Sequence, residues 1–227
     1  MGKLYIVSTP IGNMKDISLR ALEILFSVDV ILCEDTRKSG MLLEHYKEYS
    51  NDPDKKPGLM SFYQGNEDRK MNHIIELLKE GKDVALISNS GTPLLSDPGF
   101  KLVRECVREK IEVIPIPGAS ALLAGLVVSG LPMDKFLFLG FLPKKQGKKR
   151  KVLEDLKGKN MTTIFYESPF RIKKTLEMID ELLPESNIVI ARELTKKFEE
   201  TMRGTAKELI AKLGDKKVKG ELTVVMN

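Results

Sequence analysis

Short apolar runs alternate with amphipathic segments along the whole chain. The apolar runs are four to six residues long and end at glycine, proline or charged residues, and the segments between them repeat apolar positions every three or four residues. The first run, residues 4–8, precedes a segment at 16–28 that places Ala21, Ile24 and Leu25 on one face. This regular alternation of strand and helix predicts an α/β protein.

The same rules predict the remaining elements. Asn66 and Gly81 are expected to begin and end one helix, and Asp97 with Pro98 to begin another. A charged segment at 51–58 is expected to be a loop, and the basic segment after residue 141 another. The expected strands are 4–8, 30–33, 59–62, 84–88, 113–116, 136–141, 162–166, 188–191 and 221–226, and the expected helices are 16–28, 39–47, 66–80, 98–109, 119–129, 152–157, 169–183 and 206–213.

Proline and glycine interrupt this order near the middle of the chain. Pro117 and Gly118 follow the fifth strand and separate two stretches that each contain several strands and helices. We therefore expect two α/β domains with mixed sheets, residues 1–117 and 118–227. The run at 84–88 is almost entirely apolar, which is typical of a central parallel strand covered on both faces.

Composition narrows the function classes only modestly. A net charge of +5 permits nucleic-acid binding without requiring it. Two histidines cannot build a histidine-rich metal site, and we expect no metal. Cys33 and Cys106 are expected to be buried thiols in a reducing cytoplasm. No apolar run is long enough to span a membrane and no Walker A motif is present, and we expect no signal peptide.

Candidate chemistry collects after the strands, where open α/β sheets bind ligands. Residues 89–99 are rich in small residues, and 117–121 opens a helix. A ligand-binding loop and a plain turn explain 89–91 and 117–121 equally well, whereas 96–99 is better explained as a turn that caps a helix. Charged groups occur at 34–37, 166–171 and 191–196. Each cluster alone is best explained as solvated ion pairs, whereas three such clusters at strand ends together favour a functional site. A basic run at 144–151 is suited to phosphate or to solvent.

Seven sequence motifs occur in order along the chain and include these loops. They are T-P-I-G-N at 9–13, E-D-T-R at 34–37, S-x-x-G-T-P-L-x-S-D-P-G at 88–99, P-G-x-S-A at 117–121, G-F-L-P at 140–143, F-Y-E-S-P-x-R at 165–171 and A-R-E-L-T-K at 191–196. Together they resemble the ribosomal RNA small subunit methyltransferase I family of the tetrapyrrole methylase superfamily (class III methyltransferases). The resemblance extends from Leu4 to Met226.

The resemblance implies a 2′-O-methyltransferase that acts on a cytidine ribose of 16S rRNA in the small ribosomal subunit. It implies S-adenosylmethionine bound in a cleft between two α/β domains, and a homodimer. Two departures stand out: Asn89 replaces an aspartate of the family pattern, and Phe170 replaces a histidine.

Roles are carried over to the matching positions. Asp35 and Glu167 are the first choices for a catalytic base, ahead of Glu34 and Glu193, and Arg37 and Lys196 complete the catalytic set. The cofactor would contact Pro10, Ser88, Asn89, Ser90, Gly91, Leu94, Ser120, Ala121, Tyr166, Ala191, Arg192, Glu193 and Leu194. RNA would contact Lys144, Lys145, Lys148, Lys149, Arg150, Lys151 and Arg171.

Two other functions stay open at this point. A methylase of small tetrapyrrole substrates would share the fold, and the basic run at 144–151 argues against it. A non-catalytic RNA-binding relative is the second alternative, for which Asn89 is the main indication.

Overall fold

The computed structural model describes residues 1–50, 56–214 and 217–227. The chain divides into two compact units, residues 1–120 and 121–227. The sequence placed this boundary between residues 117 and 118. Most of the expected loop at 51–58 lies outside the described residues.

A parallel sheet forms the centre of the first unit. Its strands lie in the order β3-β2-β4-β1-β5, and every strand pair is parallel. β4 occupies the middle and all three of its residues are buried, which confirms the central strand predicted from its apolar sequence. The strand bounds are β1 Leu4–Val7, β2 Val30–Cys33, β3 Gly58–Ser61, β4 Val84–Leu86 and β5 Val113–Ile116.

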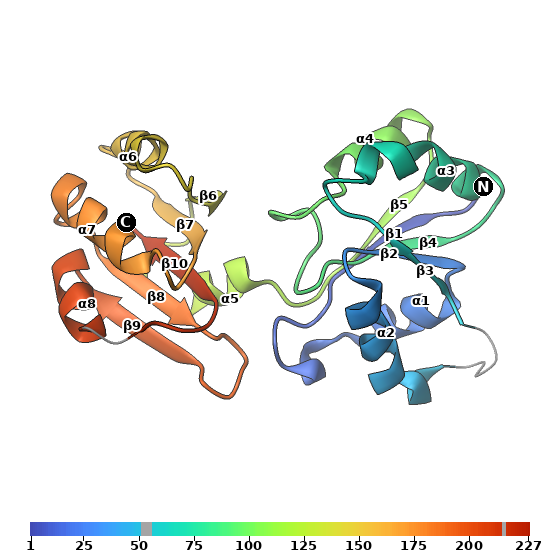
Figure 1. Ribbon diagram of the computed structural model, residues 1–227, viewed down its shortest axis with the longest axis horizontal. Coiled ribbons are helices and arrows are strands. Elements are labelled where there is room, and N and C mark those ends of the chain that lie inside the picture. The colour runs from blue at the N-terminus through green and yellow to red at the C-terminus, as the bar shows by residue number, and fades with distance from the viewer. Residues whose placement is uncertain (51–55, 215–216) are drawn as a thin grey trace. The chain divides into compact units, whose positions relative to one another are not determined.

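Helices cover both faces of this sheet (Figure 1). α1 (Leu19–Ser27) and α2 (Thr36–His45) pack on one face, and α3 (Glu67–Lys79) and α4 (Phe100–Arg108) on the other. Two single-turn helices, η1 (Met14–Asp16) and η2 (Lys47–Tyr49), flank the first pair. α1 and α3 bury the apolar faces that their spacing predicted, including Leu25 and Ile74.

The predicted start of α4 at Asp97 and Pro98 is wrong. The helix begins after Gly99, whose φ of 123° lies in the region that favours glycine. A Cβ at Gly99 would lie 2.5 Å from Leu86 Cδ2, so the backbone here packs directly on β4. Asp97 is therefore free of a capping role.

The second unit contains a mixed sheet in the order β6-β7-β10-β8-β9. β6 and β7 are parallel, and the other pairs are antiparallel. The α/β fold class is confirmed, whereas mixed strand direction holds only for this second sheet. β9 was not predicted, because its residues are mostly polar. The bounds are β6 Phe136–Phe141, β7 Thr162–Glu167, β8 Ile188–Arg192, β9 Glu200–Gly204 and β10 Leu222–Met226.

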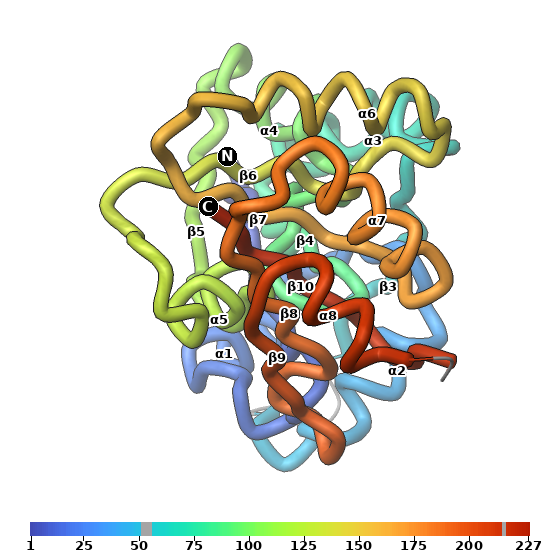
Figure 2. Tube along the Cα trace, turned by 90° about the vertical axis from the view of Figure 1, so that its left-hand side faces the viewer, coloured from blue at the N-terminus to red at the C-terminus, as the bar shows by residue number. Residues whose placement is uncertain are grey.

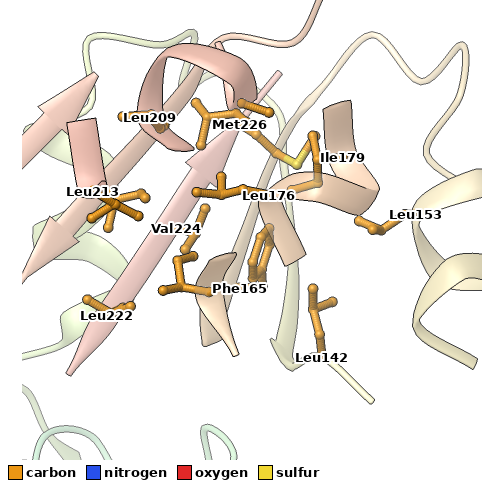
Figure 3. Close-up of a cluster of buried hydrophobic side chains, with 14 of the residues drawn as sticks. Leu142, Leu153, Phe165, Leu176, Ile179, Leu209, Leu213, Leu222, Val224 and Met226 are labelled. Atoms are coloured by element: carbon orange, nitrogen blue, oxygen red, sulfur yellow. The ribbon is translucent and has the colours of Figure 1, made fainter. Parts of the chain in front are cut away.

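Three helices cover one face of this sheet (Figure 2). α6 (Gln146–Glu154), α7 (Ile172–Leu182) and α8 (Ala206–Leu213) contribute side chains to one core with alternate residues of β10, among them Val224 and Met226 (Figure 3). α5 (Ala121–Val127) packs against the opposite side of β10, where Thr223 points.

The basic run does not form the loop predicted for it. α6 begins at Gln146 and carries most of the basic residues, so the helix predicted at 152–157 starts six residues earlier. The basic residues hid an amphipathic pattern, because Leu153 and Lys149 both point inward.

Candidate functional site

Hydrogen bonds join three loops of the first unit at the carboxyl ends of β1 and β4. Thr9 and Gly91 exchange backbone hydrogen bonds of 3.0 and 3.1 Å. The Thr9 hydroxyl donates to the Ser88 carbonyl at 3.2 Å, and the Thr92 hydroxyl donates to the Ala119 carbonyl at 3.1 Å. The segments around residues 9, 91 and 119 are thus held together, and Pro10 is buried beside them.

Glycine is required where these loops meet. Gly91 has a φ of 83°, and a Cβ there would lie 3.1 Å from Ile11 Cγ2. A Cβ at Gly118 would lie 2.9 Å from Ser8 Cβ. Leu94 and Ser96 also adopt positive φ, a strained conformation that concentrates at ligand-binding sites. Asn89 and Ser90 remain exposed next to this rigid base.

Two carboxylates lie beside the same loop. The Asn89 backbone N–H donates to Glu34 Oε1 at 3.3 Å. Burial and then the charge of Glu34 raise the pKa of Asp97 to about 6, against the opposing hydrogen bond from Ser88. The sequence assigned Asp97 to a helix cap and missed it as a candidate base. The available signal was its place in the polar loop after the central strand.

Asp35 serves a structural purpose. It caps α2, where its carboxylate accepts a hydrogen bond of 3.0 Å from the Arg37 backbone N–H. That hydrogen bond is the main reason why the pKa of Asp35 lies below its ordinary value. A capping carboxylate of lowered pKa is a weak proton acceptor. Arg37 extends into solvent, with 90% of its side chain exposed.

Glu167 lies in a fully buried ionic cluster of the second unit. Its side chain is 0% exposed and receives hydrogen bonds from Lys149 Nζ at 2.9 Å, Thr175 Oγ1 at 2.7 Å and the Ser168 backbone at 2.7 Å. Arg171 adds an ion pair. Burial acts to raise the Glu167 pKa, but these bonds outweigh it and the pKa is lowered. A carboxylate buried and paired in this way is poorly placed to accept a proton from an acceptor hydroxyl.

Burial also removes Lys149 from the predicted RNA-binding set. Its side chain is 0% exposed and bound to Glu167 and Thr175, so no phosphate can reach it. Arg150 is partly exposed and paired with Glu154 and Glu181. Arg171 is 23% exposed and paired with Glu167. Four lysines of the run stay exposed: Lys144, Lys145, Lys148 and Lys151.

Charged residues after β8 are paired with one another. Lys196 Nζ lies 3.0 Å from Glu193 Oε1 and 2.7 Å from Glu221 Oε2. Burial acts to lower the Lys196 pKa, but these two carboxylates outweigh it and raise the pKa. Arg192 pairs with Glu200 at 2.9 Å. The Lys196 ammonium is thus paired with two carboxylates and is not free to act as a catalytic group.

The predicted cofactor residues fall into two groups, one in each unit. The first unit brings together Pro10, Ser88, Asn89, Ser90, Gly91, Leu94 and Ser120 around the joined loops. In the second unit Ala121 begins α5, and Tyr166 is the second-last residue of β7, beside Phe138 and Phe141. Ala191 and Arg192 end β8, and Glu193 and Leu194 follow it. Glu193 adopts a positive φ of 51°.

Comparison with known proteins assigns the family. Residues 3–210 match the Tetrapyrrole (Corrin/Porphyrin) Methylases. The chain is 48% identical to the ribosomal RNA small subunit methyltransferase I of Thermotoga maritima, over 100% of this chain and 99% of that protein. The chain belongs to the ribosomal RNA small subunit methyltransferase I family. Its members are tetrapyrrole-methylase-type methyltransferases.

Solved structures of this superfamily share the fold at low identity. The methyltransferase CobJ aligns with a TM-score of 0.70 and 18% identity, over 100% of this chain and 94% of that chain. The uroporphyrin-III C-methyltransferase of Thermus thermophilus, solved in complex with S-adenosyl homocysteine, aligns with a TM-score of 0.63 and 17% identity, over 100% of this chain and 97% of that chain.

The asparagine at position 89, which departs from the methyltransferase I family pattern, has little effect on the local contacts. Asn89 meets Glu34 through its backbone N–H, which any residue except proline supplies. The exchange of aspartate for asparagine therefore leaves this contact intact, and it gives little support to a non-catalytic relative.

Over residues 1–50, 56–214 and 217–227, no three His, Cys, Asp or Glu side chains gather as metal ligands. Within the same ranges, no helix has the length and apolar character to cross a membrane.

Proposed function

We propose that this protein transfers the methyl group of S-adenosylmethionine to the ribose 2′-oxygen of a cytidine in 16S rRNA of the small ribosomal subunit. The observation that carries the proposal is the full-length match at 48% identity to a methyltransferase of that name. We further propose that it works in the cytoplasm as a homodimer.

The loops of the first unit fit a nucleoside cofactor. Gly91 and the residues joined to it form a rigid base without bulky side chains, next to the exposed Asn89 and Ser90. Such a surface lets a ligand approach backbone amides closely. The sulfonium of the bound cofactor would supply an electrophilic methyl group, so positioning of the acceptor contributes much of the rate. Leu94 and Ser120 adjoin this base.

The exposed lysines favour RNA over a tetrapyrrole acceptor. Lys148 and Lys151 are exposed one turn apart on α6, and the exposed Lys144 and Lys145 directly precede the helix. Four exposed ammonium groups this close in the chain can meet two or more phosphates of an RNA strand.

The acceptor hydroxyl needs a proton acceptor, and we assign that role to Asp97. It lies in the loop that carries the cofactor candidates and hydrogen-bonds Ser88. Asp35 caps a helix, and Glu167 is sequestered. A base with a pKa near the working pH is the most effective, typically by about 10²- to 10⁴-fold.

The test is methyl transfer with labelled S-adenosylmethionine and two acceptors. Small ribosomal subunits that lack the modification should take up label, and a uroporphyrinogen-type tetrapyrrole should not. Label only in the tetrapyrrole would support the small-molecule methylase. Binding of RNA without binding of S-adenosylmethionine by calorimetry would support the non-catalytic relative.

A further inference from the structure

A β-bulge turns one aromatic side chain of the second unit toward solvent. β6 pairs with β7 in regular register up to Phe138, and the register shifts before Phe141. Gly140, between them, has a φ of 61°. Bulges re-aim side chains, and here the result is that 60% of Phe141 is exposed. An exposed phenylalanine at the end of a sheet strand has no role in the core.

Other rings support Phe141 from one side. Its centroid lies 5.4 Å from that of Tyr166, and Tyr166 in turn lies 5.1 Å from Phe138 in an edge-to-face contact. Rings held in this way lose little conformational freedom when a planar partner stacks on them. Phe141 is therefore preorganised for a flat ligand.

Positive charge follows Phe141 directly in the chain. Leu142 is buried in the core of the unit and fixes the backbone between the ring and the first lysine. Lys144, Lys145 and Lys148 come next and are all exposed. Aromatic rings beside exposed cations are the combination by which proteins bind single-stranded nucleic acids, since every base offers a flat face and every linkage a phosphate.

We propose that Phe141, supported by Tyr166, is a stacking platform for an unpaired base of the RNA acceptor. This rests on the proposed function and adds the kind of RNA recognised: a single-stranded segment, whose phosphates contact Lys144, Lys145 and Lys148. In a duplex the bases are stacked on one another and cannot reach the ring.

Phe141→Trp provides a direct test, because the chain contains no tryptophan. The variant should bind a short unstructured pyrimidine RNA, and that RNA should quench its only indole. The same RNA in a duplex should quench it far less. Phe100→Trp is the matched control: Phe100 is 65% exposed, lies 5.7 Å from the Arg104 guanidinium and should not respond.

Truncation complements the fluorescence. Phe141→Ala should weaken binding of the single-stranded RNA by about 5- to 100-fold, while Phe141→Tyr retains it. The dependence of binding on salt should stay unchanged, because no phosphate contact is lost. Equal thermal unfolding of the alanine and tyrosine variants excludes misfolding as the cause.

Four results would overturn the platform. They are wild-type affinity of Phe141→Ala for single-stranded RNA, no quenching at saturating RNA, quenching by S-adenosyl homocysteine alone, and emission that changes with protein concentration. The third would assign the ring to the adenine of the cofactor, and the fourth to contact between copies. Failure of the proposed function gives a different result from failure of the platform: RNA would quench the indole, but no methyl group would be transferred.

Discussion

Lys149 and Glu167 form an ion pair inside the second unit, with Nζ 2.9 Å from Oε2 and both side chains 0% exposed. The pair joins α6 to the end of β7, and Thr175 adds a hydrogen bond from α7. Two residues that the sequence assigned to RNA binding and to catalysis thus hold each other in the interior.

Removal of one partner should destabilise the protein. Lys149→Met leaves Glu167 with less compensation for its burial, and we expect a loss of about 3 kcal/mol in the free energy of unfolding. Urea denaturation measures it, with Lys148→Met, an exposed neighbour, as a near-neutral control. Because the folded-state pKa of Glu167 lies below its ordinary value of 4.5, the pair stabilises the fold above that pH and the contribution is lost as pH falls. Equal stability of the two variants at pH 7 would contradict the account.

Asp97→Asn should raise the stability of the fold and lower the methyltransferase activity. The folded-state pKa is raised from 3.8 to about 6, so ionisation of Asp97 costs stability as pH rises through that interval. The asparagine variant should be more stable at pH 8 by about 1 kcal/mol, a value reduced for partial exposure, and unchanged at pH 3.

The same substitution should slow methyl transfer at least about 100-fold and abolish the acid limb of the pH–rate profile near pH 6. Asp35→Ala is the comparison: it should lose about 1 kcal/mol with its helix cap but keep that acid limb. Persistence of the limb in Asp97→Asn would remove Asp97 as the base.

Substitution of the exposed lysines in α6 and just before it should change the salt dependence of RNA binding. Replacement of Lys144, Lys148 or Lys151 by methionine should each lower the slope of log affinity against log salt by about 0.7 for a single-stranded RNA. Lys207, exposed on α8, should leave the slope unchanged. Unaltered slopes in all three of these lysine variants would place the RNA elsewhere on the protein.

A methyl group at Gly91 should impair cofactor binding. Gly91→Ala forces a Cβ to 3.1 Å from Ile11 at a φ of 83°, so the loop that Thr9 and Gly91 join must shift. We expect at least 10-fold weaker binding of S-adenosylmethionine by calorimetry, since backbone amides in the loop would move. Gly147→Ala, where a Cβ meets open space, is the control and should bind normally.

Most of the fold could be predicted because strand and helix periods differ. β2, β5, β6 and α8 begin and end at the residues that the apolar pattern indicated. β9 escaped prediction because its sequence, Glu200 to Gly204, is polar and its pairing with β8 depends on contacts distant in the chain.

The candidate site was predicted less completely, since side-chain environment is a property of the folded chain. The sequence motifs located the loops around Ser88 and Gly91. The sequence does not distinguish Lys149 from the exposed lysines next to it, because only its position on α6 buries its side chain. The sequence around Asp97 is typical of a helix cap, but in the structure Gly99 is the residue that precedes α4. Burial, which separates these roles, depends on packing that local sequence does not encode.

The most direct test of the proposed activity is the identity of the methylated nucleoside. Small ribosomal subunits lacking the modification would be incubated with the protein and methyl-labelled S-adenosylmethionine, and their 16S rRNA digested to nucleosides for mass spectrometry. The account predicts label in 2′-O-methylcytidine, at a level that falls at least 100-fold with Asp97→Asn. Label on a base, on another nucleoside's ribose, or on no RNA at all would contradict it.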